Sequence, residues 1–181
     1  MIYQTKHIPL RDGRAAVLRS PGAADAAGMM AYLRTCAEET DFILRYPEEC
    51  DETDEQEARF LESINESPYN LMMVCEVDGE IAGNCQISLN KRIKWRHRAA
   101  VAIALVKKYW NLGIGTVMMG ELAAIARAKG VTQLELDYVE GNERARRLYE
   151  KAGFVKTGEK PNAIRLKDGT MLREISMVKY L

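Results

Sequence analysis

Several features that mark other protein classes are missing from this chain of 181 residues. It contains two histidines and four cysteines, with no Cys-x-x-Cys pair, so the ligand spacing of a zinc site is absent and we expect no metal. No apolar run approaches the roughly 18 residues that span a bilayer, and the first residues lack the basic start and apolar run of a signal peptide. We therefore expect a cytoplasmic protein with reduced thiols and no membrane partner.

A net charge is also missing, because 26 basic residues balance 26 acidic ones. This balance argues against a strongly basic nucleic-acid-binding protein, and we expect no nucleic-acid partner. Hydrophobic residues make up 47% of the chain, which is enough for a core without disulfides, and no repeat or low-complexity linker divides it. Length and composition thus predict a single domain over residues 1–181.

Changes in hydrophobic periodicity divide the chain into helices and strands. Helices are predicted from residue 22 to about 37, at 53–64, from 113–115 to 129 and at 142–151, and strands at 2–9, 15–19, 70–77, 80–89, 99–106, 133–139, 154–164 and 171–179. Asp-Gly pairs at 12–13 and 78–79 are typical of hairpin turns, and Thr53 with Gln56 fits a capping box. The 99–106 strand is apolar throughout, which predicts burial on both faces. The order of elements indicates an α+β fold.

The most informative segment runs from Lys107 to Thr116, between the apolar strand and the next helix. Gly113 and Gly115 allow a tight turn and a close approach of the backbone to a ligand. The first N–H groups of a helix have no intrahelical partner, and with the helix dipole they form an anion site suited to a pyrophosphate. A dinucleotide fingerprint needs a third glycine where Met118 stands, and the Gly-Lys-Ser/Thr of a P-loop is absent. A dinucleotide oxidoreductase is therefore disfavoured.

Two segments resemble motifs of the GNAT superfamily of N-acetyltransferases. Trp110-Asn111-Leu112-Gly113-Ile114-Gly115 is similar to the family's acetyl-CoA motif Gln/Arg-x-x-Gly-x-Gly/Ala, with Trp110 in place of Gln or Arg. Residues 142–154, Asn-Glu-Arg-Ala-Arg-Arg-Leu-Tyr-Glu-Lys-Ala-Gly-Phe, resemble the family's Asn-x-x-Ala-x-x-Leu-Tyr-x-Lys-x-Gly-Phe and begin 27 residues after Gly115, behind a strand. The resemblance covers about residues 96–155 and rests on element order elsewhere.

This resemblance implies a mixed, largely antiparallel central sheet flanked by helices, with a central strand pair that splays apart at the CoA site. It implies acetyl-CoA as co-substrate and transfer of its acetyl group to a primary amine, of a small molecule or of a protein or peptide, by direct attack. A homodimer is a possible assembly. The residues that the resemblance assigns to cofactor binding are Leu105, Val106, Lys107, Asn111, Leu112, Gly113, Ile114, Gly115, Thr116, Asn142, Arg146 and Tyr149.

The resemblance also assigns a catalytic role to Tyr149, as the acid that protonates the departing CoA sulfur. From its spacing alone, the preferred interpretation of Tyr149 is a tyrosine that packs one helix face with Ala145 and Leu148, and the resemblance reverses that preference. The backbone N–H near Val106 is the expected oxyanion donor. Asn142 is expected to cap its helix and also to contact CoA.

The general base is the least determined residue. Glu135 is our named candidate, Asp137 shares its strand face, and Glu48 or Glu49 in the acidic segment are further candidates. His97 titrates in the right range, but a lone histidine is more often structural. A cysteine acyl-enzyme route is disfavoured because Cys75 and Cys85 fall in apolar strands.

Two questions of charge and activity stay open in the sequence. The segment 48–57 either attracts a cationic acceptor or is a solvated helix start. Lys107, Lys108, Arg144, Arg146 and Arg147 either meet the 3′-phosphate of CoA or are solvated charges. A non-catalytic acyl-CoA-binding module is the alternative function, because the central strand carries no carboxylate and Trp110 replaces Arg or Gln.

Overall fold

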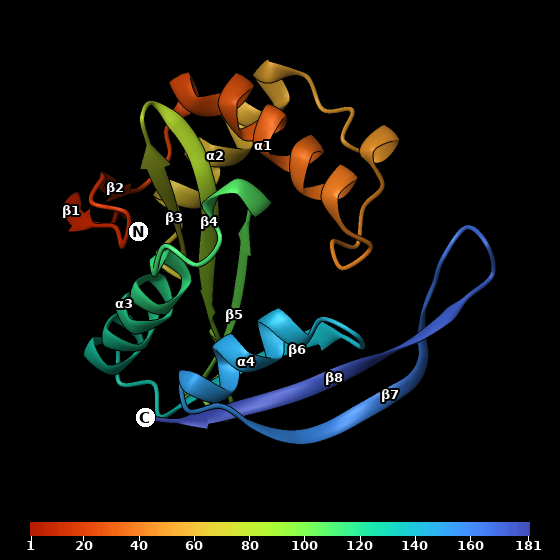
Figure 1. Ribbon diagram of the computed structural model, residues 1–181. Helices are drawn as coiled ribbons and strands as arrows, with labels where there is room; N and C mark the ends of the chain where they lie inside the picture. Colours follow the sequence, from red (N-terminus) through yellow and green to blue (C-terminus); the bar gives the residue numbers. More distant parts are fainter.

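The computed structural model describes all residues from Met1 to Leu181 (Figure 1). The helices are α1 (Ala26–Glu39), α2 (Asp54–Glu66), α3 (Ile114–Ala128) and α4 (Glu143–Lys151), with short 3-10 turns at Ala23–Asp25, Pro47–Glu49 and Lys107–Tyr109. The strands are β1 (Lys6–Pro9), β2 (Ala15–Arg19), β3 (Asn70–Val77), β4 (Glu80–Leu89), β5 (Arg98–Leu105), β6 (Gln133–Val139), β7 (Val155–Arg165) and β8 (Met171–Tyr180). No helix is both long enough and apolar enough to cross a membrane.

All eight strands form one sheet, in the order β1-β2-β3-β4-β5-β6-β8-β7. Every neighbouring pair is antiparallel except β5 and β6, which run parallel and are joined by the crossover helix α3. The β3–β4 hairpin turns at Asp78 and Gly79, whose φ angles of +54° and +82° are those of a type I′ turn. The sheet is therefore mixed but largely antiparallel, in agreement with the sequence.

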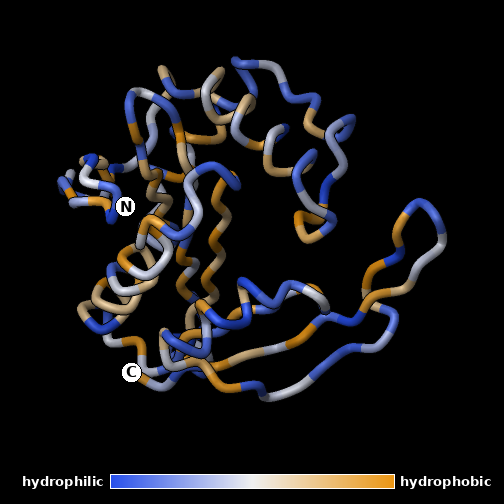
Figure 2. Tube along the Cα trace, in the orientation of Figure 1, coloured by the Kyte–Doolittle hydropathy of each residue, from blue (hydrophilic) through white to orange (hydrophobic).

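Helices cover both faces of the central strands. On one face α1 lies against β4 and β5. There the Tyr32 hydroxyl lies within hydrogen-bond distance of two acceptors, Asn84 Oδ1 (3.0 Å) and Ala104 O (3.1 Å). On the other face α3 packs so closely that a Cβ on Gly115 would lie 3.4 Å from the Leu105 side chain. Hydrophobic residues follow β3 to β5 and α3 (Figure 2), and most of them belong to one cluster of 33 buried residues. The core thus lies around the strands that precede the glycine turn.

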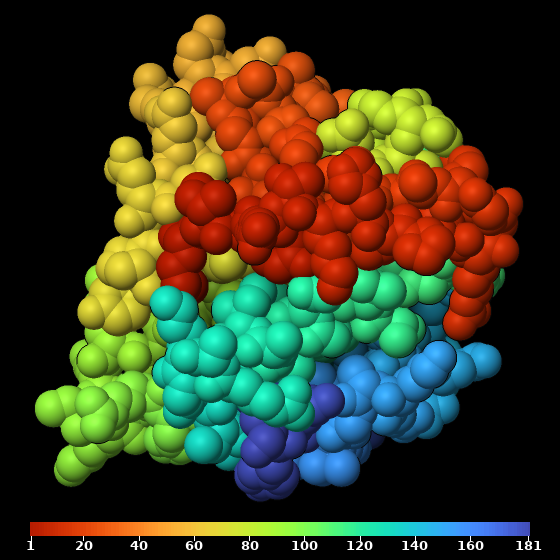
Figure 3. All heavy atoms as spheres, turned by 90° about the vertical axis from the view of Figure 1, so that its left-hand side faces the viewer, coloured from red at the N-terminus to blue at the C-terminus, as the bar shows by residue number.

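The N-terminal residues lie between α2 and α3 and tie them together (Figure 3). The amino group of Met1 donates to Asn65 O (2.8 Å) at the end of α2, and the Tyr3 hydroxyl donates to Glu121 on α3 (2.8 Å). Lys6 forms an ion pair with the same Glu121 at 2.5 Å. These contacts fix the position of α3, which carries the predicted anion site at its start.

The structure confirms most predicted elements to within a few residues and corrects two of them. The first strand begins at Lys6 rather than Ile2. The strand predicted at 99–106 spans Arg98–Leu105 and is not buried on both faces, because Ala100 and Ala102 are exposed. Ala102 lines an open cavity, described below.

Candidate active site

The two parallel strands are hydrogen-bonded over a short length and then diverge. Their register covers Arg98 with Gln133 through Ala100 with Glu135 and stops there, although β5 continues to Leu105. N–H groups alternate between the two edges of a strand. Because Val106 N–H donates to Ala82 O of β4 (3.0 Å), the N–H groups of Leu105 and Ile103 face the opening toward β6. The Val106 N–H is therefore paired with β4, and the adjacent N–H groups that face the opening are those of Leu105 and Ile103.

The glycine turn at the start of α3 has the geometry of an anion cradle. Gly113 has a φ of +92°, a conformation that L side chains rarely adopt. The first intrahelical bond runs from Val117 N–H to Gly113 O (3.2 Å), which leaves the N–H groups of Ile114, Gly115 and Thr116 without a protein partner. The preceding carbonyl of Leu112 is held by Arg11 N–H (3.3 Å), from the β1–β2 hairpin. The helix end therefore presents three free donors and the positive end of its dipole.

Trp110 has a structural role that the sequence did not indicate. Its Nε1 donates to Leu105 O (2.8 Å), which fixes the turn to the end of β5. The guanidinium of Arg144 lies over its ring, 4.3 Å from the centroid, and also donates to Asn111 Oδ1 (2.7 Å). Trp110 thus positions a cation from α4 beside the glycine turn.

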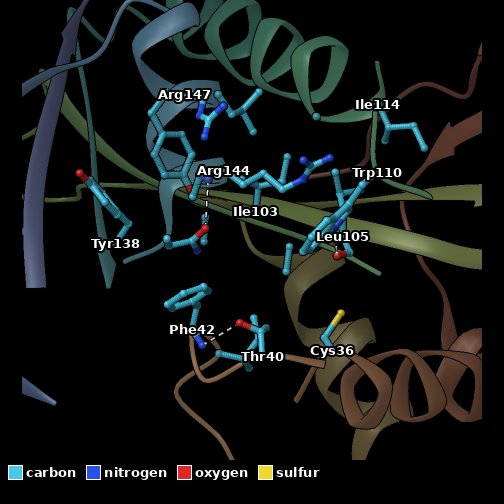
Figure 4. Close-up of a pocket in the computed structure, with 18 of the residues that line it drawn as sticks. Cys36, Thr40, Phe42, Ile103, Leu105, Trp110, Ile114, Tyr138, Arg144 and Arg147 are labelled. Atoms are coloured by element: carbon cyan, nitrogen blue, oxygen red, sulfur yellow. Dashed lines mark hydrogen bonds between the residues drawn. The ribbon is translucent and has the colours of Figure 1, made fainter. Parts of the chain in front are cut away.

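A cavity of about 550 Å³ joins the glycine turn to the opening between β5 and β6 (Figure 4). Of the residues assigned to cofactor binding, it is lined by Leu105, Asn111, Gly113, Ile114, Gly115, Thr116, Asn142 and Tyr149. Val106, Lys107, Leu112 and Arg146 do not line it. Arg146 points away because it is paired with Glu143 (2.6 Å) and Glu150 (3.1 Å) on the outer side of α4. Its neighbours Arg144 and Arg147 line the cavity instead.

Tyr149 is buried in the wall of this cavity, on α4. Its residue exposure is 6%, and its ring lies 6.0 Å from that of Tyr138 and 6.1 Å from that of Phe154. Burial raises the pKa of the Tyr149 phenol to about 12, so the hydroxyl keeps its proton at neutral pH. Asn142 caps the same helix through Oδ1, which accepts from Ala145 N–H (3.1 Å). The cap leaves the Asn142 amide group available to a ligand.

Comparison with known proteins decides the family. A family model described as the acetyltransferase (GNAT) family matches residues 33–154, about two thirds of the chain. The chain belongs to the GNAT acetyltransferase family. A GNAT-family acetyltransferase from Streptococcus pneumoniae is 29% identical, with a TM-score of 0.84 over 92% of this chain and 99% of the other. The match identifies the protein as an N-acetyltransferase.

Two more distant solved structures share the fold of this GNAT protein. A ribosomal-protein-alanine N-acetyltransferase from Brucella melitensis is 24% identical, with a TM-score of 0.77 over 91% of this chain and 99% of the other. A phosphinothricin acetyltransferase from Sinorhizobium meliloti, solved in complex with acetyl-CoA, is 21% identical, with a TM-score of 0.77 over 92% of this chain and 88% of the other.

Within this GNAT fold, Glu135 does not reach the cavity. It lies in the paired part of β6, where it forms an ion pair with Arg98 and accepts from Gln133 Nε2 (2.5 Å). The Arg98 guanidinium holds the pKa of Glu135 below its usual value, so it is a poor proton acceptor. Asp137, two residues further along β6, lines the cavity and accepts from the Ser176 hydroxyl (2.5 Å). The sequence could not distinguish Glu135 from Asp137 as the candidate base, because the pairing of Glu135 with Arg98 is a tertiary contact.

The other candidates for the base are occupied elsewhere in the GNAT domain. Glu48 forms an ion pair with Lys167 at the tip of the β7–β8 hairpin, and Glu49 accepts from Tyr46 N–H (2.7 Å). Tyr46 also accepts from Lys167 N–H (2.9 Å), so the α1–α2 connection touches the hairpin tip. His97 does not line the cavity.

Thiol chemistry does not fit this GNAT site. All four cysteines are free and buried. Cys36 alone lines the cavity, and burial raises the pKa of its thiol to about 11, so its thiolate is scarce at neutral pH. The buried-thiol interpretation of the sequence therefore holds for each of them.

Sequence reasoning missed the residues that close the cavity from the α1–α2 connection. Thr40, Phe42, Ile43 and Leu44 line it, and Thr40 and Phe42 lie on the side of the cavity opposite Arg144 and Arg147 (Figure 4). The Phe42 ring also lies 3.7 Å from where a Cβ on Gly141 would be. Hydrophobic periodicity does not identify these residues, because they are placed by the chain's return from α1 rather than by a regular element.

Proposed function

We propose that this protein is an acetyl-CoA-dependent N-acetyltransferase that transfers the acetyl group to a primary amine by direct attack. The observation that carries the proposal is the opening between β5 and β6, which has an anion cradle at one end and a buried tyrosine beside it. The free N–H groups of Ile114, Gly115 and Thr116 suit the pyrophosphate of CoA. The bound acetyl-CoA supplies an already activated thioester.

The two faces of the sheet give acetyl-CoA and the amine separate routes to the opening. Leu105 and Ile103 share the face that packs against α3 and α4, where Tyr149 lies. Ala102, Ala104 and Asp137 belong to the opposite face, because Glu135 is level with Ala100 and side chains alternate along a strand. Acetyl-CoA then lies along α3 and α4, and the amine enters beneath the α1–α2 connection.

In this arrangement each step has a residue to support it. The acceptor ammonium first loses a proton to Asp137, directly or through water, because the neutral amine is scarce near pH 7. The amine nitrogen attacks the thioester carbonyl, and the free N–H of Leu105 or Ile103 stabilises the developing oxyanion. The C–S bond of the tetrahedral intermediate then breaks, and Tyr149 gives its proton to the departing CoA thiolate. The new C–N bond stays, and the nitrogen loses its second proton through water to the Tyr149 phenolate, which restores the tyrosine. The products are the acetylated amine and CoA.

A thiol-release assay with acetyl-CoA and a panel of primary amines tests the proposal. We expect turnover with at least one amine and a fall in kcat of about 10²-fold or more in Tyr149→Phe, with unchanged CoA affinity. Tyr180→Phe, at an exposed position outside the cavity, is the control and should match the wild type. CoA binding without turnover across the panel would instead support the non-catalytic module.

A further inference from the structure

A second cavity on the amine side of the sheet holds a buried carboxylate that the mechanism does not use. Glu57 lies on α2 with 5% of its surface exposed. No group of the protein donates to its Oε1, which is itself fully buried. An unpaired buried carboxylate is costly, because the charge loses its water without gaining a partner. A bound cation from outside the protein would offset this cost.

The cavity around Glu57 has both apolar and polar lining residues. Its volume is about 440 Å³, and its four hydrophobic lining residues are Met29 and Leu33 of α1, Phe60 of α2 and Met72 of β3. These side chains suit an aliphatic chain.

None of the charged residues around this cavity forms an ion pair with Glu57. The other charged residues that line it are Arg45 and Glu52. The Arg45 guanidinium is bound to both carboxylate oxygens of Glu52, at 2.6 and 2.8 Å. Burial raises the pKa of Glu57, the nearby charge of Glu52 raises it further, and the Arg45 guanidinium lowers it by less than these two raise it. A bound ammonium would reverse both effects.

This cavity borders the proposed path of the acceptor. It is lined by Asn84 and Gln86 of β4, whose register partners on β5 are Ala104 and Ala102. Both alanines line the cavity that contains Asp137. Paired residues on neighbouring strands point to the same face, so the two cavities border each other on this face of the sheet.

We propose that Glu57 binds a second cationic group of the acceptor, so that the preferred substrates are aliphatic diamines. One amino group reacts in the opening beside Asp137, the carbon chain lies along the sheet face, and the distal ammonium donates to the Glu57 carboxylate. This inference rests on the proposed function, since it names the class of amine that the same site takes.

The test compares α,ω-diamines of increasing length with the n-alkylamines of matched length. We expect wild-type kcat/KM to be at least tenfold higher for the best diamine than for its matched monoamine. Glu57→Gln keeps the shape and removes the charge, and it should lower kcat/KM for the diamine about tenfold or more through KM. The monoamine should be affected less than twofold. Glu55→Gln, on the same helix but exposed, should change neither.

Two readouts separate this inference from the proposed function. Calorimetric titration of 1,5-diaminopentane and of pentylamine into the CoA-bound wild type requires no turnover, and we expect tighter binding of the diamine. Equal binding of the two, or an unchanged diamine-to-monoamine ratio in a folded Glu57→Gln, would overturn the inference while leaving the acetyltransferase proposal intact. Absence of turnover with every amine would overturn the proposed function instead.

Discussion

The carboxylates of Glu135 and Asp137, which are two residues apart on β6, have different environments. Glu135 sits where β5 and β6 are still paired, and Arg98 neutralises it. Asp137 sits beyond the point of divergence and lines the cavity. A proton acceptor must reach the amine, and of these two carboxylates only Asp137 lines the cavity.

Substitution of the two carboxylates should therefore have unequal effects. In Asp137→Asn we expect kcat/KM for the amine to fall by about 10²-fold or more, because the acceptor of the ammonium proton is lost. Glu135→Gln should keep kcat/KM within about twofold and cost less than about 1 kcal/mol of stability, as for a part-exposed ion pair. Steady-state kinetics on both variants, with CoA titration as a binding check, decides the matter. Equal losses would contradict the assignment.

The buried carboxylate of Glu57 should leave a signature in the pH dependence of stability. Its pKa in the folded state is raised above the ordinary 4.5, so the folded protein holds this proton more tightly than the unfolded chain. Its contribution is complete below pH 4.5 and is lost as pH rises through the folded-state pKa. Without amine, the Tm of Glu57→Gln minus that of the wild type should therefore increase from pH 4 to pH 7. A difference that does not change with pH would show that Glu57 ionises freely.

At the scale of single residues, the sequence was most informative where a motif was local. Tyr149 and Asn142 lie on one short helix, and the structure places both on the cavity. The general base and the oxyanion donor are harder to predict from the sequence. They depend on where β5 and β6 diverge and on which neighbouring strand a backbone N–H faces, and a single strand does not contain that information.

The start of α3 is the element on which the proposed cofactor site depends. Its donors point outward only if Gly113 keeps a φ of +92°. Further along the same helix, Gly120 is in an ordinary helical position, with no atom within 4 Å of its missing Cβ. Gly120 is therefore a matched control for an alanine substitution at Gly113.

Alanine at these two glycines should have opposite effects. Gly113→Ala forces a Cβ into a left-handed conformation, and we expect a loss of about 1–2 kcal/mol and a several-fold weaker affinity for CoA. Gly120→Ala should stabilise the helix by about 0.5–1 kcal/mol without changing CoA affinity. Urea unfolding and calorimetric titration measure both quantities. A neutral Gly113→Ala would mean that the turn tolerates another backbone conformation.

At this scale the sequence predicted nearly every helix and strand, because caps, Asp-Gly turns and changes of period are local signals. It mistook β5 for a strand covered on both faces. An apolar run looks the same whether it faces a core or an open cavity, and only the position of α1 and its connection decides between them.

Across the whole molecule, the zero net charge conceals a separation of charges. Arg11, Arg144, Arg147 and Lys151 line the cavity, and the first three come from the parts that surround the glycine turn. The segment 48–57 places its acidic residues on the other side, where part of them are neutralised by Arg45 and Lys167. The cationic side suits the phosphates of CoA.

Neutralising single arginines of α4 should reveal which side of the helix meets CoA. Arg147→Gln removes a cation that lines the cavity, and we expect a several-fold weaker CoA affinity and a weaker salt dependence of that affinity. Arg146→Gln removes a cation already paired with Glu143 and Glu150, so it should leave CoA affinity unchanged. CoA titrations at two salt concentrations distinguish them. A larger effect of Arg146 would restore its role as a cofactor ligand.

The short pairing between β5 and β6 also indicates where the chain can be cut into two fragments. Residues 1–105 supply β1 to β5 and residues 133–181 supply β6 to β8, so each block of the sheet is one uninterrupted stretch of chain. A break in the exposed turn at Gly130 would separate two fragments without removing any strand from its antiparallel neighbours. We expect residues 1–129 and 130–181, expressed together, to reassemble into an active enzyme by fragment complementation. Because the catalytic opening lies on the seam between them, activity itself would report their reassembly.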